Sequence, residues 1–211
     1  MFHLMQIVYL VASACVVAPV VAADRAWQGY QDGNYVVAAK DYERRARQGE
    51  KLAQFNYAMM LLRGEGVSVD PKAGLQWLNR AADGGLAQAQ FAMGLLYEHG
   101  ELVAKSLAEA TRWFGLAAQQ GHVGAQQNLA TQYFLGRGAQ KDMALAAKWY
   151  LKAAEGGDMA SQYIIGTLYE QGDGIQKDDS QALFWFTQAA RQGDMAAGIR
   201  AKVVARRLAA E

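Results

Sequence analysis

The sequence predicts an all-α fold, namely a right-handed α/α superhelical solenoid of stacked antiparallel helix pairs. Two observations carry this prediction. A tryptophan recurs at a constant interval of 36 residues, at Trp77, Trp113, Trp149 and Trp185. A glycine follows each of them at the same interval, at Gly85, Gly121, Gly157 and Gly193. A period of roughly 20–50 residues is typical of stacked supersecondary units, each of which buries its apolar face against its neighbours. A catalytic group is needed once, so a pattern that occurs four times indicates architecture.

Bulk composition is consistent with a helical domain that has no polyanionic partner. The chain has 211 residues, enough for one domain with a substantial core. Its 21 basic and 20 acidic residues leave a net charge of +1, whereas a general nucleic-acid binder needs a basic field. We therefore expect no nucleic-acid partner. Only two prolines occur, which suits a chain of helices.

Residues 1–23 have the pattern of a secretory signal peptide. They contain no Asp, Glu, Lys or Arg, and an apolar run ends in the small residues Ala22 and Ala23 before the first charge at Asp24. We expect cleavage after Ala23 and a periplasmic or secreted protein. Because no Lys or Arg precedes the run, an uncleaved membrane anchor stays open as an alternative. A lipoprotein processing site at 12–15 is disfavoured by the apolar residues after Cys15. This cysteine is the only one, so a cleaved chain forms no disulfide.

One repeat, residues 125–160, shows how the two helices of a pair are encoded. Its first half carries apolar or small residues on one helical face, and Gly136 and Gly138 then break the helix. Asp142 is placed to cap the second helix, which carries Trp149 and a pair of alanines before two glycines end it. Each tryptophan is expected to be buried and to contribute strongly to the packing of its unit. The helices should have about 12–14 residues and the loops about 4–6.

Equivalent cap positions recur along the chain, and further elements flank the repeats. The expected caps are Asp70 (followed by Pro71), Ser106, Asp142, Asp158, Asp178, Asp194 and, as a helix-start residue, His122. Ser106 with Glu109, and less closely Asp178 with Gln181, fit a capping box. The expected domains are a degenerate helix pair at 24–52, four repeats at 53–88, 89–124, 125–160 and 161–194, and a capping helix at 195–211.

The repeated pattern, A-x-x-x-L/M-G-x-x-Y-x-x-G-x-G-V/I-x-x-D followed by A-x-x-W-Y/F-x-x-A-A-x-x-G, resembles the Sel1-like repeat family, relatives of the tetratricopeptide repeats. Residues 161–193 match it best. The second copy has Leu102 in place of a loop glycine, so its turn is expected to differ, and the first copy has Leu61 in place of the tyrosine. The resemblance implies a scaffold or adaptor that binds proteins along a concave groove. Exported bacterial members of the family act at the cell envelope. A cysteine-rich branch with β-lactam-related activity has a disulfide bond in each repeat. This chain has no cysteines to form such bonds after residue 23, so that activity is not carried over.

In related solenoids the first helix of each pair lines the groove, and this gives a set of candidate partner-binding residues. Asn56 and Asn128 match a position where some tetratricopeptide proteins hold a ligand backbone or carboxylate, and asparagine is also common there for structural reasons. Such clamps need several cations, of which only Arg63 qualifies. The candidates are Asn56, Met59, Arg63, Ala92, Leu95, His99, Gln127, Asn128, Thr131, Ile164 and Thr167. An apolar, amide-lined groove favours an extended or helical protein segment.

No catalytic or metal-binding motif accompanies these residues. His99 and His122 are the only histidines after residue 23, and no H-E-x-x-H, C-x-x-C, G-x-S-x-G or P-loop occurs. The sequence therefore predicts a monomeric, non-enzymatic scaffold of the bacterial envelope, with a protein partner, no cofactor and no metal. The alternatives are a hydrolase or binder acting on cell-wall material or β-lactams, and a periplasmic regulator of a membrane sensor.

The last segment is basic and amphipathic. It carries Arg200, Lys202, Arg206 and Arg207 beside Ile199, Val203, Val204 and Leu208. We expect a cap whose apolar stripe packs on the last repeat and whose charges face water. The alternative is a helix that lies on an anionic membrane surface, which together with an uncleaved N-terminus would be the only membrane contact.

Overall fold

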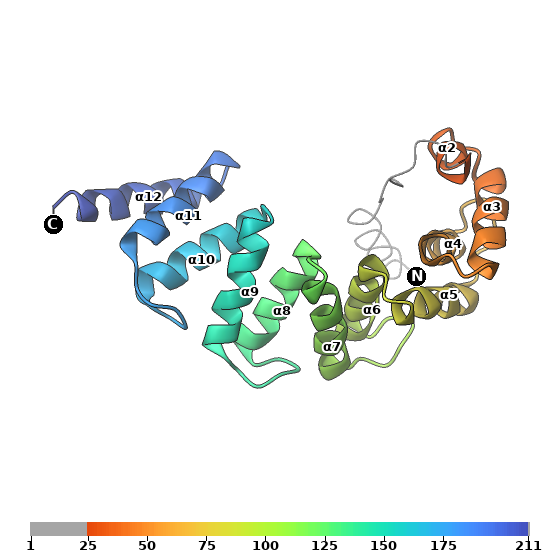
Figure 1. Ribbon diagram of the computed structural model, residues 1–211, viewed down its shortest axis with the longest axis horizontal. Coiled ribbons are helices and arrows are strands. Elements are labelled where there is room, and N and C mark those ends of the chain that lie inside the picture. The colour runs from red at the N-terminus through yellow and green to blue at the C-terminus, as the bar shows by residue number, and fades with distance from the viewer. Residues whose placement is uncertain (1–24, 211) are drawn as a thin grey trace. The chain divides into compact units, whose positions relative to one another are not determined.

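The computed structural model describes residues 25–210, and all regular structure in this range is helical (Figure 1). The predicted signal peptide lies outside the described residues. Across residues 25–210, no helix combines the length and the apolar character needed to cross a membrane. The helices are α2 (Arg25–Gln31), α3 (Tyr35–Arg47), α4 (Lys51–Arg63), α5 (Pro71–Asp83), α6 (Ala87–His99), α7 (Leu107–Gln119), α8 (Val123–Leu135), α9 (Met143–Glu155), α10 (Met159–Gln171), α11 (Asp179–Arg191) and α12 (Met195–Leu208).

The chain divides within α7 into two compact units, whose described residues are 25–116 and 117–210. Each unit is a stack of helix pairs, α4 with α5 in the first and α8 with α9 and α10 with α11 in the second. Helices α2 and α3 occupy the two segments in which the degenerate pair was expected, and Gly33 between them has a φ of 76°. The predicted α/α solenoid of helix pairs is confirmed.

The predicted helix caps are formed by local side-chain bonds. The carboxylate of Asp70 accepts the Ala73 N–H at 3.0 Å, and Pro71 is the first helical residue. Nδ1 of His122 accepts the Ala125 N–H at 3.2 Å, which confirms its role as a helix-start residue. The other aspartate caps bond in the same way at 2.7–3.0 Å, from Asp142, Asp158, Asp178 and Asp194.

The capping box at Ser106 is only half formed. The Ser106 hydroxyl accepts the Glu109 N–H at 3.3 Å, but the Glu109 carboxylate pairs with Arg112 at 2.9 Å instead of returning to Ser106. The Ser106 N–H already donates to the Tyr97 carbonyl at 2.9 Å. Because this N–H is used to close the loop, the reciprocal half of the predicted box has no donor. The same backbone bond closes the other long loops, from Asp70, Asp142 and Asp178.

Connections between helices alternate in length, and they are longer or shorter than the expected loops of about 4–6 residues. Long loops follow the first helix of each pair, at 64–70, 100–106, 136–142 and 172–178, and short turns follow the second, at 84–86, 120–122, 156–158 and 192–194. In the short turn at Gly85, the Gly85 N–H donates to Ala82 and the Leu86 N–H donates to Ala81, at 2.9 and 3.0 Å. These bonds satisfy the helix-end carbonyls, so the chain reverses with few residues.

Leu102 keeps the loop conformation of the glycines that it replaces, contrary to the expectation of a different turn. Its φ is 59°, beside 70° at Gly66 and 72° at Gly138. A left-handed backbone is costly for a residue with a Cβ. The Leu102 side chain packs against the buried cluster of the first unit, and this burial offsets the conformational cost.

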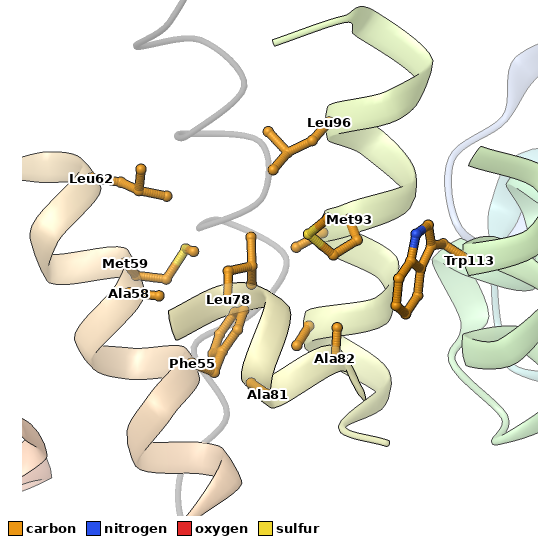
Figure 2. Packing of buried hydrophobic residues seen from close by; sticks show 12 residues of the cluster. Phe55, Ala58, Met59, Leu62, Leu78, Ala81, Ala82, Met93, Leu96 and Trp113 are labelled. Carbon is orange, nitrogen blue, oxygen red and sulfur yellow. The ribbon is translucent and has the colours of Figure 1, made fainter. Parts of the chain in front are cut away.

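The first unit contains a buried cluster between α4, α5, α6 and α7 (Figure 2). Phe55 and Met59 of α4 point toward Leu78 of α5, and Met93 of α6 and Trp113 of α7 close the other side. A second cluster joins α2 and α3 to α4, around Tyr42. The second unit has one cluster around Tyr150 and Ile165 and another around Phe186 and Val204.

The tryptophans are not equally buried, so the expectation that each of them is buried is wrong. Trp113 and Trp185 are 4% and 8% exposed, whereas Trp77 and Trp149 are half-buried. Arg80 lies over the Trp77 ring at 4.5 Å and Lys152 over the Trp149 ring at 5.4 Å, which covers their outer faces. The residue after each tryptophan is buried in every repeat, namely Leu78, Phe114, Tyr150 and Phe186.

Helix α12 packs through half of the apolar stripe that the sequence predicted. Val204 is fully buried and Leu208 packs against the cluster around Phe186, but Ile199 and Val203 are 65% and 45% exposed. The charges also do not all face water, because Arg200 pairs with Glu170 of α10. Arg207 bonds to Glu170 at 3.1 Å and to Asp179 of α11 at 2.5 Å. The side chain of Glu170 is 7% exposed, which makes these ion pairs a docking contact.

Candidate partner-binding surface

In the first unit, the candidate residues of α4 and α6 divide between surface and core. Asn56 and Leu95 are half-buried and His99 is exposed, with Nε2 4.0 Å from the carboxylate of Glu98. Met59 is 7% exposed and Ala92 is fully buried, and both belong to the cluster in Figure 2. These two are core residues and offer no surface to a partner. Helix α4 is apolar around most of its circumference, so its periodicity does not distinguish the face toward α5 from a groove face.

Arg63, the single predicted cation of the groove, is already engaged by its own unit. Its guanidinium lies 3.5 Å from the Glu65 carboxylate and donates to the Tyr30 hydroxyl at 3.2 Å. The Tyr30 hydroxyl in turn donates to Glu65 at 2.8 Å. Burial, strengthened by this bond to Glu65, raises the pKa of Tyr30 to about 12, so the phenol stays protonated. The three groups form a closed network and not a carboxylate clamp.

In the second unit, the candidate residues of α8 and α10 lie on the half-buried flanks of those helices. The Thr131 hydroxyl donates to the Gln127 carbonyl at 3.0 Å and lies 2.9 Å from the Tyr150 hydroxyl. The Thr167 hydroxyl donates to the Tyr163 carbonyl at 3.1 Å, a bond within its own helix. These threonine hydroxyls are therefore partly used inside the unit, and Ile164 packs against the cluster around Tyr150.

The asparagine amides differ from these groups. Within residues 25–210, no hydrogen bond from another protein group reaches the side chain of Asn56 or of Asn128, although both are half-buried. A half-buried amide has two donors and one acceptor oxygen to offer. Asn56 and Asn128 therefore keep unused hydrogen-bonding capacity, as does the half-buried amide of Gln127 beside Asn128.

His122, a titratable group of the second unit, is already engaged inside that unit. Burial lowers the pKa of His122, whose Nδ1 is occupied as a helix cap. In the part of the chain that the structure describes, no group of three or more His, Cys, Asp or Glu side chains is placed to hold a metal ion. The arrangement presents hydrogen-bonding and apolar surface.

Sequence reasoning missed a set of buried glutamines at the same 36-residue interval. Each lies in the first helix of a repeat and donates from Nε2 to a carbonyl at the end of the preceding helix, at 3.2 Å in all four cases. The bonds run from Gln54 to Ala46, from Gln90 to Ala82, from Gln126 to Ala118 and from Gln162 to Ala154. A polar residue repeated with the tryptophan period was the signal that could have revealed them.

A chain of paired helices that repeats every 36 residues is an α/α solenoid. The sequence matches the Sel1 repeat at residues 51–86, 87–122, 123–158 and 160–194, and the chain belongs to this family. Solenoids of this family generally serve as scaffolds for protein–protein interaction and are typically not catalysts.

Solved structures agree with this assignment. A Sel1 repeat protein from Oxalobacter formigenes is 32% identical with a TM-score of 0.77, over 83% of this chain and 72% of that one. A protective antigen of uropathogenic Escherichia coli with an SLR fold is 29% identical with a TM-score of 0.74. That match covers 96% of this chain but 41% of the antigen, so this chain spans less than half of its length. No curated protein matches the chain.

Proposed function

We propose that this protein is an exported scaffold of the bacterial envelope that holds a partner polypeptide along the first helices of its repeats. The observation that carries the proposal is the state of the groove candidates. The arginine there, Arg63, is closed into a network with Glu65 and Tyr30, while the amides of Asn56 and Asn128 keep unused donors and acceptors. Such amides suit the backbone of a bound protein segment, whereas the guanidinium of Arg63 stays protonated and does not transfer a proton.

The test begins with capture of the partner from an envelope fraction by the purified protein, followed by mass spectrometry. The dissociation constant of that partner is then measured for Asn56→Ala with Asn128→Ala. We expect the double variant to bind about 10-fold more weakly, because two hydrogen bonds of roughly 0.5–1.5 kcal/mol each are lost. Lys148→Ala is the matched control, since Lys148 is exposed on the second helix α9. Unchanged affinity of the double variant would refute the groove assignment.

Export and the absence of catalysis are tested separately. N-terminal sequencing of the protein from a periplasmic fraction is expected to begin at Asp24. A start at Met1 in the membrane fraction would refute cleavage. Nitrocefin, a chromogenic β-lactam, is expected to be turned over no faster than in buffer. A clear rate that disappears in a point variant would overturn the scaffold proposal in favour of the hydrolase.

A further inference from the structure

Helix α12 exposes an apolar stripe on the side opposite to the one that packs on the repeats. Met195, Ile199 and Val203 are 84%, 65% and 45% exposed, and their spacing of four residues places them in one row along the helix. Lys202 and Arg206 are exposed on the same side, because at 100° per residue they fall between or beside these three positions. We call these five residues the outer face of α12.

The earlier repeats show what covers the equivalent face. Ile199 occupies the position of Tyr163, one 36-residue period earlier, and of Phe91, three periods earlier. The Phe91 ring meets Phe114 of the next helix with centroids 5.9 Å apart, and Tyr163 meets Phe186 with centroids 5.6 Å apart. In both repeats the cover is an amphipathic helix that presents an aromatic side chain. Within residues 25–210, no such helix lies on the outer face of α12.

The charge of the outer face selects among possible occupants. The sequence of α12, Met195 to Leu208, contains no acidic residue. Arg200 and Arg207 are neutralised by Glu170 and Asp179, whereas Lys202 and Arg206 form no ion pair among the described residues. An occupant therefore gains from carrying carboxylates beside its apolar row.

Two other occupants fit less well. A second copy packed through the same face would place Lys202 and Arg206 of both copies together without a carboxylate between them. An anionic membrane would take the apolar row into hydrocarbon, but Arg206 lies within that row and would have to enter the hydrocarbon with it.

We propose that the outer face of α12 is a docking surface, beyond the groove candidates of α4, α6, α8 and α10, which binds an acidic amphipathic helix of a partner protein. The partner helix covers α12 from the side from which α7 covers α6 and α11 covers α10, but less closely, because Lys202 stands at the position of Gly94 and Gly166. Its aromatic or aliphatic row packs on Met195, Ile199 and Val203, and its carboxylates pair with Lys202 and Arg206.

The experiment uses two synthetic helical peptides that copy the apolar positions of α11, Asp179–Arg191, and carry either Glu or Lys at all solvent-facing positions. Fluorescence anisotropy with the full-length protein measures both dissociation constants. We expect the Glu peptide to bind at least 10-fold more tightly than the Lys peptide at low salt. Lys202→Glu with Arg206→Glu reverses the preference, and Ile199→Asp weakens binding of the Glu peptide about 10-fold or more. All three positions are exposed, so folding is retained and is checked by circular dichroism.

Leu135→Asp is the matched control, because Leu135 is 50% exposed on α8 and its replacement leaves the outer face of α12 intact. Equal affinity for the two peptides, absence of binding, or an effect of Leu135→Asp as large as that of Ile199→Asp would overturn the proposal. Co-flotation with phosphatidylglycerol vesicles that Ile199→Asp abolishes would assign the face to a lipid surface instead. A dimer in sedimentation analysis that Ile199→Asp dissociates would assign it to a second copy.

Discussion

Replacement of Gly94 by alanine tests the packing between the two helices of a repeat most directly. Gly94 lies in α6 beneath Phe114 of α7, and a Cβ at this position would be 2.5 Å from Cδ1 of that ring and closer still to Cε1. Gly166 lies beneath Phe186 in the same way, with a Cβ 2.9 Å from Cδ1. The equivalent residues Ala58 and Ala130 face Leu78 and Tyr150. Where alanine stands, no phenylalanine ring covers it.

The Tyr150 ring shows why alanine is tolerated in the third repeat. It lies 6.3 Å from the Phe134 ring, four residues after Ala130, and its hydroxyl meets Thr131. The Phe114 and Phe186 rings instead meet Phe91 and Tyr163, three residues before the glycines. The direction of the ring is therefore coupled to the glycine beneath it.

The magnitude follows from two opposing terms. A helix-interior Gly→Ala change stabilises by roughly 0.8–1 kcal/mol through backbone propensity, and overpacking of a filled site costs roughly 1–3 kcal/mol. Gly115→Ala in α7 is the matched control, because a Cβ there meets nothing within 4 Å. We expect Gly94→Ala to be less stable than Gly115→Ala by about 1–3 kcal/mol. The free energy of unfolding is measured by urea titration with circular dichroism and tryptophan fluorescence.

A double-mutant cycle separates this clash from other effects. Phe114→Leu alone leaves a cavity and destabilises the protein. In combination with Gly94→Ala it recreates the Ala58–Leu78 pair of the first repeat, so the double variant should be more stable than the sum of the single changes by about 1–3 kcal/mol. Additive single effects, or a Gly94→Ala protein as stable as Gly115→Ala, would refute the reasoning.

Three further predictions concern other contacts. Burial lowers the pKa of His122, so below the ordinary value of 6.5 the unfolded chain takes up a proton that the folded chain resists, and stability decreases as the pH is lowered. His122→Asp should reduce this loss of stability between pH 7 and 5, by at most the roughly 0.5–2 kcal/mol of an N-cap. Urea titrations at both pH values measure the difference. Gln126→Leu should lower the free energy of unfolding by about 1 kcal/mol in the same assay. The loss is modest because the Ala118 carbonyl keeps its 3.0 Å bond from the Gly121 N–H. An unchanged stability would show that the glutamine bonds are dispensable. Glu170→Gln should weaken the docking of α12 by roughly 1.5–3 kcal/mol and speed amide hydrogen exchange at residues 195–208. Glu155→Gln replaces an exposed residue and should leave this exchange unaltered.

Local chemistry explains which parts of the fold the sequence predicts. Helix caps depend on one side chain and an N–H three residues on, and Asp142 and Asp158 behave as their sequence neighbours indicate. The repeat period and the helix pairs follow from the tryptophan spacing. Loop length is less accessible, because the short turns depend on backbone bonds at the helix end that the residue pattern does not specify.

Orientation around a helix is predicted least well, for a physical reason. Met59 and Ile199 sit on helices with apolar residues on more than one side, and only the neighbouring helices decide which side is covered. The pairing of Arg63 likewise depends on Tyr30, which is 33 residues away in the chain. These contacts decide whether a candidate site residue is exposed, so the residue pattern alone does not show which candidates a partner can reach.

Comparison of the four repeats separates residues that build the stack from residues free to bind a partner. The position of Gln126 is a glutamine in every repeat, and every copy makes the same carbonyl bond, so packing fixes its identity. Two residues further on, the position of Asn128 holds Asn, Ala, Asn and Ile in turn. Packing alone does not require one residue type there, because Ala92 is buried while Asn128 keeps an unused amide. A partner that hydrogen-bonds to Asn56 and Asn128 is therefore recognised at a repeat position whose residue type the packing does not fix.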